Sequence, residues 1–287
     1  EMNYKSKNII TTIPSIHLIT RNVEIPNLEW KELKEALKWE LDDVLPYSAD
    51  ESTFDYIITE KEKEKLKVLL IAVKDEIIEQ YKIPFMDLGL KTKVINVQPM
   101  ALISLLSYQN KLNEPSAIID FGHQGTRVIL ADKDNLYLSR TIVRGGIDFT
   151  ENIMDNNQLN YKKAQEYKFN NGINDKSNSS TDFEENISLL DIGNNLQNIA
   201  KEISEEISRS LEFYSIKNRG KSIEKLYITG GNSLLKGLAK ILEDEISLDV
   251  IRIDPFYNCD IERKIDQKDS FAVTIGLAAS EVIDNES

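Results

Sequence analysis

Apolar residues in the first ninety positions switch between the two-residue spacing of strands and the longer spacing of helices. The runs KNIITTI (residues 7–13) and HLITRNVEI (residues 17–25) predict two strands, and Pro14-Ser15 between them is a turn signal. Asn27 is the expected N-cap of a helix that ends before Pro46. Further predicted elements are strands at 53–59 and 66–73 and a helix at 74–88 that Pro84 kinks or ends. This order indicates an α+β module.

After Gln98 the pattern becomes that of an α/β unit with short, apolar strands. Between them, the polar stretch 169–187, rich in Asn and Ser, predicts a mobile loop. A long helix from about 187 to 217 is expected because apolar residues recur every three or four positions. The other predicted helices span 100–108, 147–154, 161–167, 234–245 and 271–282, and the predicted strands span 117–121, 127–131, 136–143, 225–229 and 249–253.

Composition narrows the function classes. The chain has 287 residues, 41% of them hydrophobic, which is enough for the cores of two domains. A net charge of -13 argues against nucleic acid as a partner, although a small anion site built from backbone amides stays possible. One cysteine and two histidines allow neither an internal disulfide nor a His/Cys zinc site. With no signal peptide or membrane-spanning run, we expect a soluble cytoplasmic protein that reaches a membrane only through a partner.

Two glycine turns at strand ends are the first candidates for chemistry. The strand ending at Asp120 is followed by Gly122, Gly125 and Thr126, a turn whose amides can face phosphate while the acid holds magnesium through water. A second strand leads into Gly230-Gly231-Asn232, where a flat ligand can approach the main chain. Each turn has an equally simple structural explanation, as a hairpin connection or a tight turn that needs positive φ.

Two more segments are candidates for a site, although each has a structural explanation that does not involve catalysis. Gly145-Gly146 ends a strand, and Asp148 is placed to cap the helix that follows. Glu205 and Arg209 lie one turn apart on the long helix, where an intrahelical ion pair is the default interpretation.

The order of these motifs resembles the actin-like ATPase superfamily, and more closely the PilM family of type IV pilus assembly, with the cell-division protein FtsA next. The front of the chain contributes Pro14-Ser15, the run from Arg21 to Pro26 and a helix closing at Val44-Leu45-Pro46. The resemblance implies an α/β, actin-like (ribonuclease H-like) two-lobed fold with an inserted small α+β subdomain and an incomplete first lobe. The implied division is 1–96 for the subdomain, 97–143 for a linking segment with the second phosphate loop, and 144–287 for the second lobe.

The same resemblance implies ATP and magnesium as cofactors. Asp120 would orient magnesium-bound water, and the loop of Gly122, Gly125 and Thr126 would approach the phosphates. Gly230, Gly231 and Asn232 match the adenosine motif, while Glu205 and Arg209 would face the ribose and the adenine plane. Gly276 matches the helix that joins the lobes and suits close helix packing.

Departures from the family limit the expected activity. The family's first phosphate loop is absent from this sequence, so it either precedes the sequence in a longer chain or is naturally missing. His123 and Gln124 stand where small residues are usual. We therefore expect no catalytic residue and at most weak ATPase activity, since phosphoryl transfer needs complete positioning.

The implied function is a scaffold at the inner face of the cell membrane. It would bind the N-terminal cytoplasmic tail of a PilN-type inner-membrane protein in a groove beside the inserted subdomain, with other pilus assembly proteins as further partners. The alternatives are an active actin-like ATPase and an FtsA-like filament protein. The latter predicts a C-terminal amphipathic membrane helix, whereas this sequence ends in the acidic EVIDNES.

Overall fold

The computed structural model describes residues 7–173, 189–257, 259, 261, 265 and 267–286. Most of the stretch predicted to be a mobile loop, residues 174–187, lies outside this set. Its first residues, 169–171, instead form the last turn of α5 (Tyr161–Asn171). Among the described helices, none combines the length and the hydropathy that a membrane crossing would need.

A five-stranded sheet forms the centre of the larger lobe, in the order β10-β9-β6-β7-β8. Strands β10 (Val250–Arg252), β9 (Leu226–Thr229) and β6 (Ser116–Phe121) run parallel, and β7 (Thr126–Ala131) and β8 (Leu136–Ile142) continue the sheet antiparallel. Because β6 lies in the middle, all of its side chains are buried. Its carboxyl end, at Asp120 and Phe121, therefore meets the carboxyl end of β9 inside the molecule.

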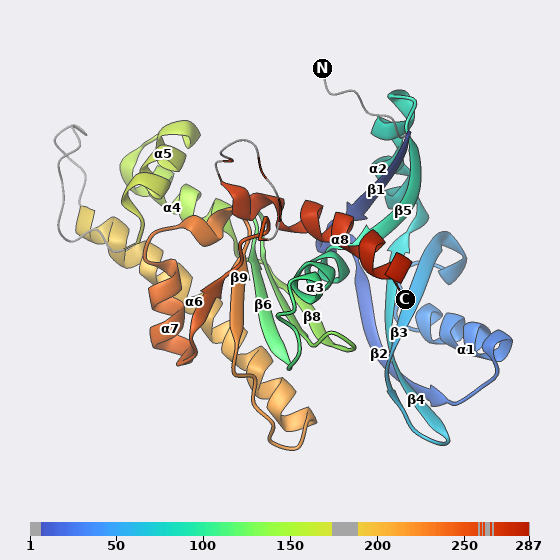
Figure 1. Cartoon of the computed structure of the whole chain (residues 1–287). Helices are drawn as coiled ribbons and strands as arrows, with labels where there is room; N and C mark the ends of the chain where they lie inside the picture. Colours follow the sequence, from blue (N-terminus) through green and yellow to red (C-terminus); the bar gives the residue numbers. More distant parts are fainter. Residues whose placement is uncertain are drawn as a thin grey trace.

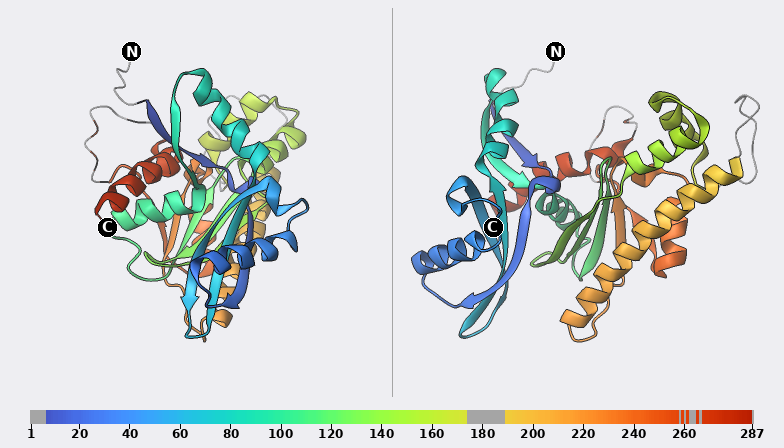
Figure 2. Two further views of the ribbon diagram at one scale, coloured as in Figure 1. Left: turned by 90° about the vertical axis from the view of Figure 1, so that its right-hand side faces the viewer. Right: turned by 180° about the vertical axis from the view of Figure 1, so that it is seen from behind.

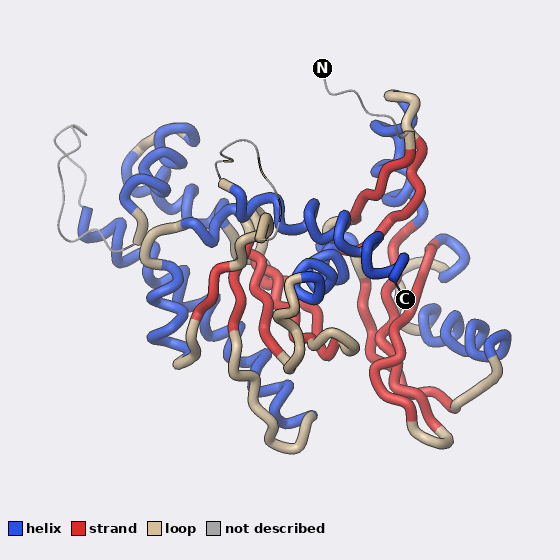
Figure 3. Tube along the Cα trace, viewed as in Figure 1, coloured by secondary structure: helices blue, strands red, loops and turns tan. Residues whose placement is uncertain are grey.

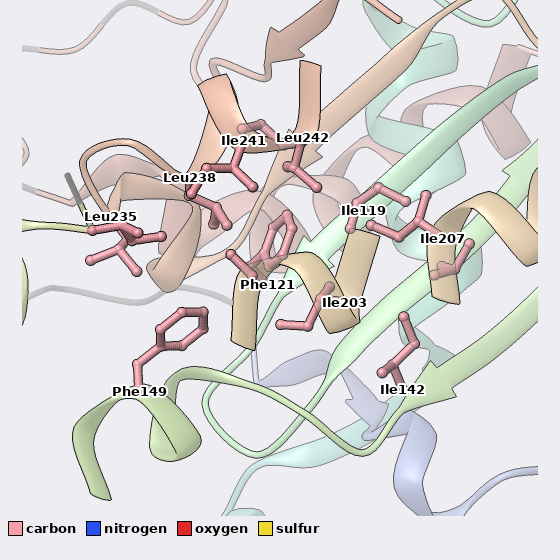
Figure 4. Close-up of a cluster of buried hydrophobic side chains, with 14 of the residues drawn as sticks. Ile119, Phe121, Ile142, Phe149, Ile203, Ile207, Leu235, Leu238, Ile241 and Leu242 are labelled. Atoms are coloured by element: carbon pink, nitrogen blue, oxygen red, sulfur yellow. The ribbon is translucent and has the colours of Figure 1, made fainter. Parts of the chain in front are cut away.

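Helices cover both faces of this sheet (Figures 1 and 2). On one face lie α4 (Gly146–Asn157), α5, the long α6 (Leu189–Lys217) and α7 (Leu238–Ile246). Figure 4 shows Phe121 of β6 and Phe149 of α4 in this core together with Ile203 and Ile207 of α6, with Ile207 next to Ile119. On the other face lie α3 (Gln98–Tyr108) and α8 (Ala272–Glu286), packed closely together. Side chains of a strand alternate between faces, so Phe121 points into the first core and Asp120 toward α3 and α8.

Two smaller sheets form the rest of the molecule, separated from the large sheet in Figure 3. One has the order β2-β4-β3 and is built from β2 (Ile19–Pro26), β3 (Ser52–Lys61) and β4 (Lys65–Lys74). Helix α1 (Trp30–Asp42) covers one face of this sheet through Leu33, Leu37 and Leu41. The other is a parallel pair of β1 (Asn8–Ile13) and β5 (Lys91–Val97), with α2 (Asp75–Asp87) against β5.

One strand of this part was missed, and two expectations are corrected. Strand β5 was not predicted, because KTKVINV mixes lysines with few apolar residues and its partner β1 is some eighty positions away in the chain. Asn27 is not the N-cap of α1: Glu29 holds that position, and Asn27 bonds to the β3–β4 turn through its N–H to the Glu64 carbonyl. The helix predicted at 74–88 is present as α2, and of the two effects expected of Pro84 the ending is excluded, because α2 continues to Asp87.

The second half follows the predicted order with shifted boundaries. The turn after β9 continues as a short 3₁₀ segment, Gly231–Leu234, and α7 begins only at Leu238 because Gly237 adopts a positive φ of 88°. Helix α8 runs past the predicted end at 282 to Glu286. The division of the chain at residues 96 and 143 stays a prediction.

Candidate functional site

A cavity of about 430 Å³ opens where the carboxyl ends of β6 and β9 meet the start of α8. Its walls include both glycine turns that the sequence singled out, Gly122 to Gly125 and Gly230-Gly231. Asp269 and Ser270, from the 3₁₀ turn before α8, close one side, and Pro14, Ile16 and Gln98 close the other. Crevices at the carboxyl ends of parallel strands are the usual ligand sites of α/β sheets.

The principal charged group in this cavity is the ion pair between Asp120 and Arg127. The Arg127 Nη1 donates to Asp120 Oδ2 at 2.5 Å, and the two side chains are only 11% and 10% exposed. Burial raises the pKa of Asp120, and the neighbouring guanidinium opposes that shift. Burial likewise lowers the pKa of Arg127. The Arg127 Nε is buried without a hydrogen-bond partner, so the guanidinium retains an unused donor.

The first glycine turn is held by the start of α4. The N–H groups of Gly146 and Ile147 donate to the carbonyls of Gly122 and His123 at 3.0 and 2.8 Å. Asp148 caps the helix as predicted, because its Oδ2 accepts from the Gly145 N–H at 2.7 Å. The N–H groups at the start of this helix therefore donate to loop carbonyls and are not available to an anion.

Asn232 connects the two glycine turns from behind. Its Nδ2 donates to the Gly122 carbonyl at 3.0 Å, and its side chain packs directly on Gly146, where an added Cβ would lie 2.1 Å from Nδ2. This contact explains Gly146, because only a residue without Cβ leaves room for the amide, whereas a Cβ at Gly145 would meet the backbone of the first glycine turn, 2.5 Å from the Gly125 nitrogen.

Lys168 of α5 completes this support as a buried cation. Its Nζ donates to the Gly146 carbonyl, Thr150 Oγ1 and Asn232 Oδ1 at 2.9 to 3.0 Å, and the side chain is 1% exposed. Burial lowers the pKa of Lys168 to about 8, since all three partners are neutral acceptors. Sequence reasoning missed this residue, because nothing local marks a helical lysine as buried.

The nine residues predicted to bind a cofactor fall into three groups. Asp120, Gly122, Gly125, Gly230 and Gly231 line the cavity. Thr126 and Asn232 are buried behind it, and Thr126 Oγ1 donates to the Arg144 carbonyl at 2.8 Å. Glu205 and Arg209 are exposed on α6, on the opposite face of the sheet, and do not line the cavity; Arg209 pairs with Glu206 there and lies 4.0 Å from Glu205. The binding roles of all nine stay predictions.

Arg127 and Asp269 are cavity residues that the sequence analysis did not name. The hairpin register could have identified Arg127, because a turn over residues 122–125 puts Phe121 opposite Thr126 and Asp120 opposite Arg127. Asp269 carries no such signal, since it precedes α8 by a few residues and is far from β6 in the chain. Burial raises its pKa, and its Oδ2 lies 3.9 Å from Arg252 Nε.

The residues present fit a phosphate-bearing ligand better than a metal alone. Two glycine turns leave the main chain accessible, and the unpartnered Arg127 Nε supplies a buried donor for an anion. No group of three or more His, Cys, Asp or Glu side chains that could hold a metal occurs among the described residues. Magnesium is usually held by one or two carboxylates together with phosphates, so a phosphate would have to complete such a site.

A mixed five-stranded sheet with paired glycine turns at the carboxyl ends of its strands defines an actin-like ATPase fold, as predicted. Among solved structures, MreB5 of Spiroplasma citri bound to AMPPNP is similar with a TM-score of 0.52 and 19% identity, covering 75% of this chain and 68% of that one. The ethanolamine utilization protein EutJ from Carboxydothermus hydrogenoformans has a TM-score of 0.50 at 12% identity, covering 86% and 72%.

The particular family is shown by the sequence. The family model for the type IV pilus assembly protein PilM matches residues 1–281, so the chain belongs to the PilM family. A structure described as the PilM-PilN type IV pilus biogenesis complex has a TM-score of 0.80 at 24% identity, covering 97% of this chain and 81% of that one. The resemblance stated from the motifs is thereby confirmed.

Proposed function

We propose that this protein is a PilM-like scaffold that binds the N-terminal cytoplasmic tail of a PilN-type inner-membrane protein. The observation that carries the proposal is the family match over residues 1–281. The structural relative that was solved as a PilM-PilN complex adds support. The scaffold works at the cytoplasmic face of the membrane, held there by its partner, and other pilus assembly proteins are further candidates for binding. A net charge of -13 disfavours direct attachment to anionic lipid.

Exposed apolar side chains on α2 and at its C-terminal end form a candidate surface for the tail. Ile83 is 51% exposed, Met86 61% and Leu88 74%, although α2 packs beside β4 of the three-stranded unit. A surface of this kind suits a peptide that inserts apolar side chains, because burying a large apolar side chain contributes about 1.5–3 kcal/mol.

The test is calorimetric titration of the whole chain with a synthetic peptide of the partner's cytoplasmic tail. Saturable binding is expected, and the double variant Ile83→Glu/Met86→Glu should weaken it about tenfold or more, because two apolar contacts are replaced by charges. Ile216→Glu is the control, since Ile216 is also an exposed apolar side chain, 81% exposed, and lies near the C-terminal end of α6. Absence of binding by the wild type contradicts the scaffold function, and equal weakening by both variants contradicts the surface assignment.

We further propose that the cavity between the glycine turns binds ATP with magnesium. Its support is the lining by Asp120, Gly122, Gly125, Gly230 and Gly231, together with the free donor of Arg127. Asp120 Oδ1 lies beside Gly230, away from Arg127, and would accept a hydrogen bond from magnesium-bound water. Asp120 Oδ2 already accepts a hydrogen bond from Arg127 and is not free to position water. We therefore expect the cavity to bind ATP without hydrolysing it efficiently.

Magnesium-ATP is expected to raise the melting temperature of the chain by about 3 to 6 °C at roughly ten times the dissociation constant. Gly231→Val should abolish the rise, because a Cβ at this position already lies 3.1 Å from Ser270 Oγ in the cavity wall. Gly193→Ala on α6 is the control, since its Cβ meets only the Ile173 carbonyl at 3.3 Å, away from the cavity. An identical rise in Gly231→Val contradicts the site, and an undiminished rise in EDTA contradicts the role of magnesium.

A further inference from the structure

A groove of about 770 Å³ lies between the two lobes at the C-terminal end of α6. Its walls are the last turns of α6 and the segment after them, the start of β8, and the three-stranded sheet β2-β4-β3. In Figure 1 this end of α6 and the β3–β4 turn reach toward the same, lower end of the molecule. No residue of the nucleotide cavity and none of the α2 surface lines this groove, so it is a separate feature.

The groove carries positive charge in a strongly acidic chain. Four basic and two acidic side chains line it. Both acids already have partners within the sheet, because Glu60 pairs with Lys67 at 2.5 Å and Glu24 pairs with Lys65. On the α6 side, Lys217, Arg219 and Lys221 have no acidic partner in the part of the chain that the structure describes. The charge that a ligand meets in the groove is therefore that of three unpaired cations.

An aromatic wall accompanies these cations. Phe213 is 43% exposed on the groove side of α6, and Lys217 Nζ lies 5.8 Å from the centre of its ring. Tyr137 and Leu138 of β8 add partly buried apolar surface beside it. A phenylalanine left open next to cations is suited to a ligand that combines an apolar side chain with negative charge.

Two of the strands that border the groove lie at the edges of their sheets. In the described sheets β2 pairs only with β4, and β8 pairs only with β7, so both are edge strands. The outer edge of such a strand presents N–H and C=O groups to which an extended segment can pair.

We propose that this groove docks an extended acidic segment of a partner protein. Its aromatic or aliphatic side chain packs on Phe213, and its carboxylates face Lys217, Arg219 and Lys221. A flat bilayer does not enter a recess between two lobes, and the net charge of -13 repels long polyanions beyond the screening distance of about 8–10 Å. A short acidic peptide meets only the local cations. Since both lobes line the groove, its occupant contacts both.

The experiment uses the whole chain and an array of heptapeptides rich in Glu and Asp, each with one aromatic or aliphatic residue. The matched array replaces every acid with Gln or Asn. Saturable binding is expected for acidic peptides, at least about tenfold tighter than for their neutral counterparts, and it should weaken with salt.

Variants of the groove decide the assignment. Lys217→Glu/Lys221→Glu should weaken binding of the acidic peptides about tenfold or more, and Phe213→Ser should weaken it without changing the salt dependence. Lys31→Glu/Lys34→Glu on α1 makes the same change in net charge on another surface and should leave binding unchanged. Equal affinity for acidic and neutral peptides, or equal effects of the two charge reversals, overturns the proposal. Binding of phosphatidylglycerol vesicles with the same residue dependence, in place of peptides, overturns it in favour of a lipid site.

Discussion

Replacing Arg127 with methionine is expected to lower the free energy of unfolding by about 3–5 kcal/mol at neutral pH. The variant keeps the volume of the side chain but leaves the Asp120 carboxylate, 10% exposed, without the cation that lies 2.5 Å away. Urea denaturation monitored by circular dichroism gives the difference. Lys240→Met is the matched control: it breaks a similarly close ion pair with Asp244 on the exposed surface of α7, where solvent screens the charges, and little or no loss of stability is expected.

The loss should depend on pH with a defined sign. Burial already holds the pKa of Asp120 above its ordinary value in the folded protein, and loss of the guanidinium raises this pKa further. A folded acid with a raised pKa binds its proton more tightly than the unfolded chain does, so stability falls as pH rises through that pKa. The deficit of Arg127→Met should therefore shrink at about pH 5 relative to about pH 7.

The double variant Asp120→Asn/Arg127→Met completes the cycle. Because it removes both charges, it should be more stable than Arg127→Met alone. If Arg127→Met is as stable as the wild type, or if its loss of stability grows at lower pH, the ion pair between Asp120 and Arg127 does not contribute this free energy of unfolding.

Gly276→Ala is expected to destabilise the protein by about 2–3 kcal/mol, although alanine is the better helix former by about 1 kcal/mol. An added Cβ would lie 2.0 Å from the carbonyl oxygen and 2.6 Å from the carbonyl carbon of Ala101. Both are backbone atoms of α3, so no side chain can yield and α8 has to move away. Because Ala272 and Val273 of α8 line the cavity that we propose binds ATP, this movement should also weaken the response to magnesium-ATP.

The control for this substitution is Ala278→Ser, which adds one atom to an exposed position of the same helix. It should change the free energy of unfolding by about 0.5 kcal/mol or less. If Gly276→Ala is as stable as the wild type, α3 and α8 are not in the close contact described.

Local patterns predicted much of this fold because the signals lie within a few residues of one another. The strand ending at Asp120, the turn over Gly122 to Gly125 and the next strand form one hairpin, and their spacing already sets the pairing. Asp148 caps α4 as predicted, since its partner is three residues away. Strand β5 was missed because its stabilising partner, β1, comes from the other end of the subdomain.

In the candidate site, too, local features were predictable and contacts between distant elements were not. The order of the glycine motifs predicted which turns meet, and Asp120, Gly122, Gly125, Gly230 and Gly231 do line one cavity. The inward turn of Asn232 onto Gly146 and the burial of Lys168 were not predictable, because each depends on packing between elements more than twenty residues apart.

By itself, the sequence determined the family, the order of most strands and helices, and the two glycine turns, because hydrophobic periodicity and turn chemistry act over short distances. Only the tertiary structure decided which charges are buried together and which surfaces stay open. It paired Arg127 with Asp120 in the cavity and left Lys217, Arg219 and Lys221 in the groove without an acidic partner among the residues that the structure describes. Burial and charge pairing depend on the distance between side chains in space, which spacing along the chain does not encode.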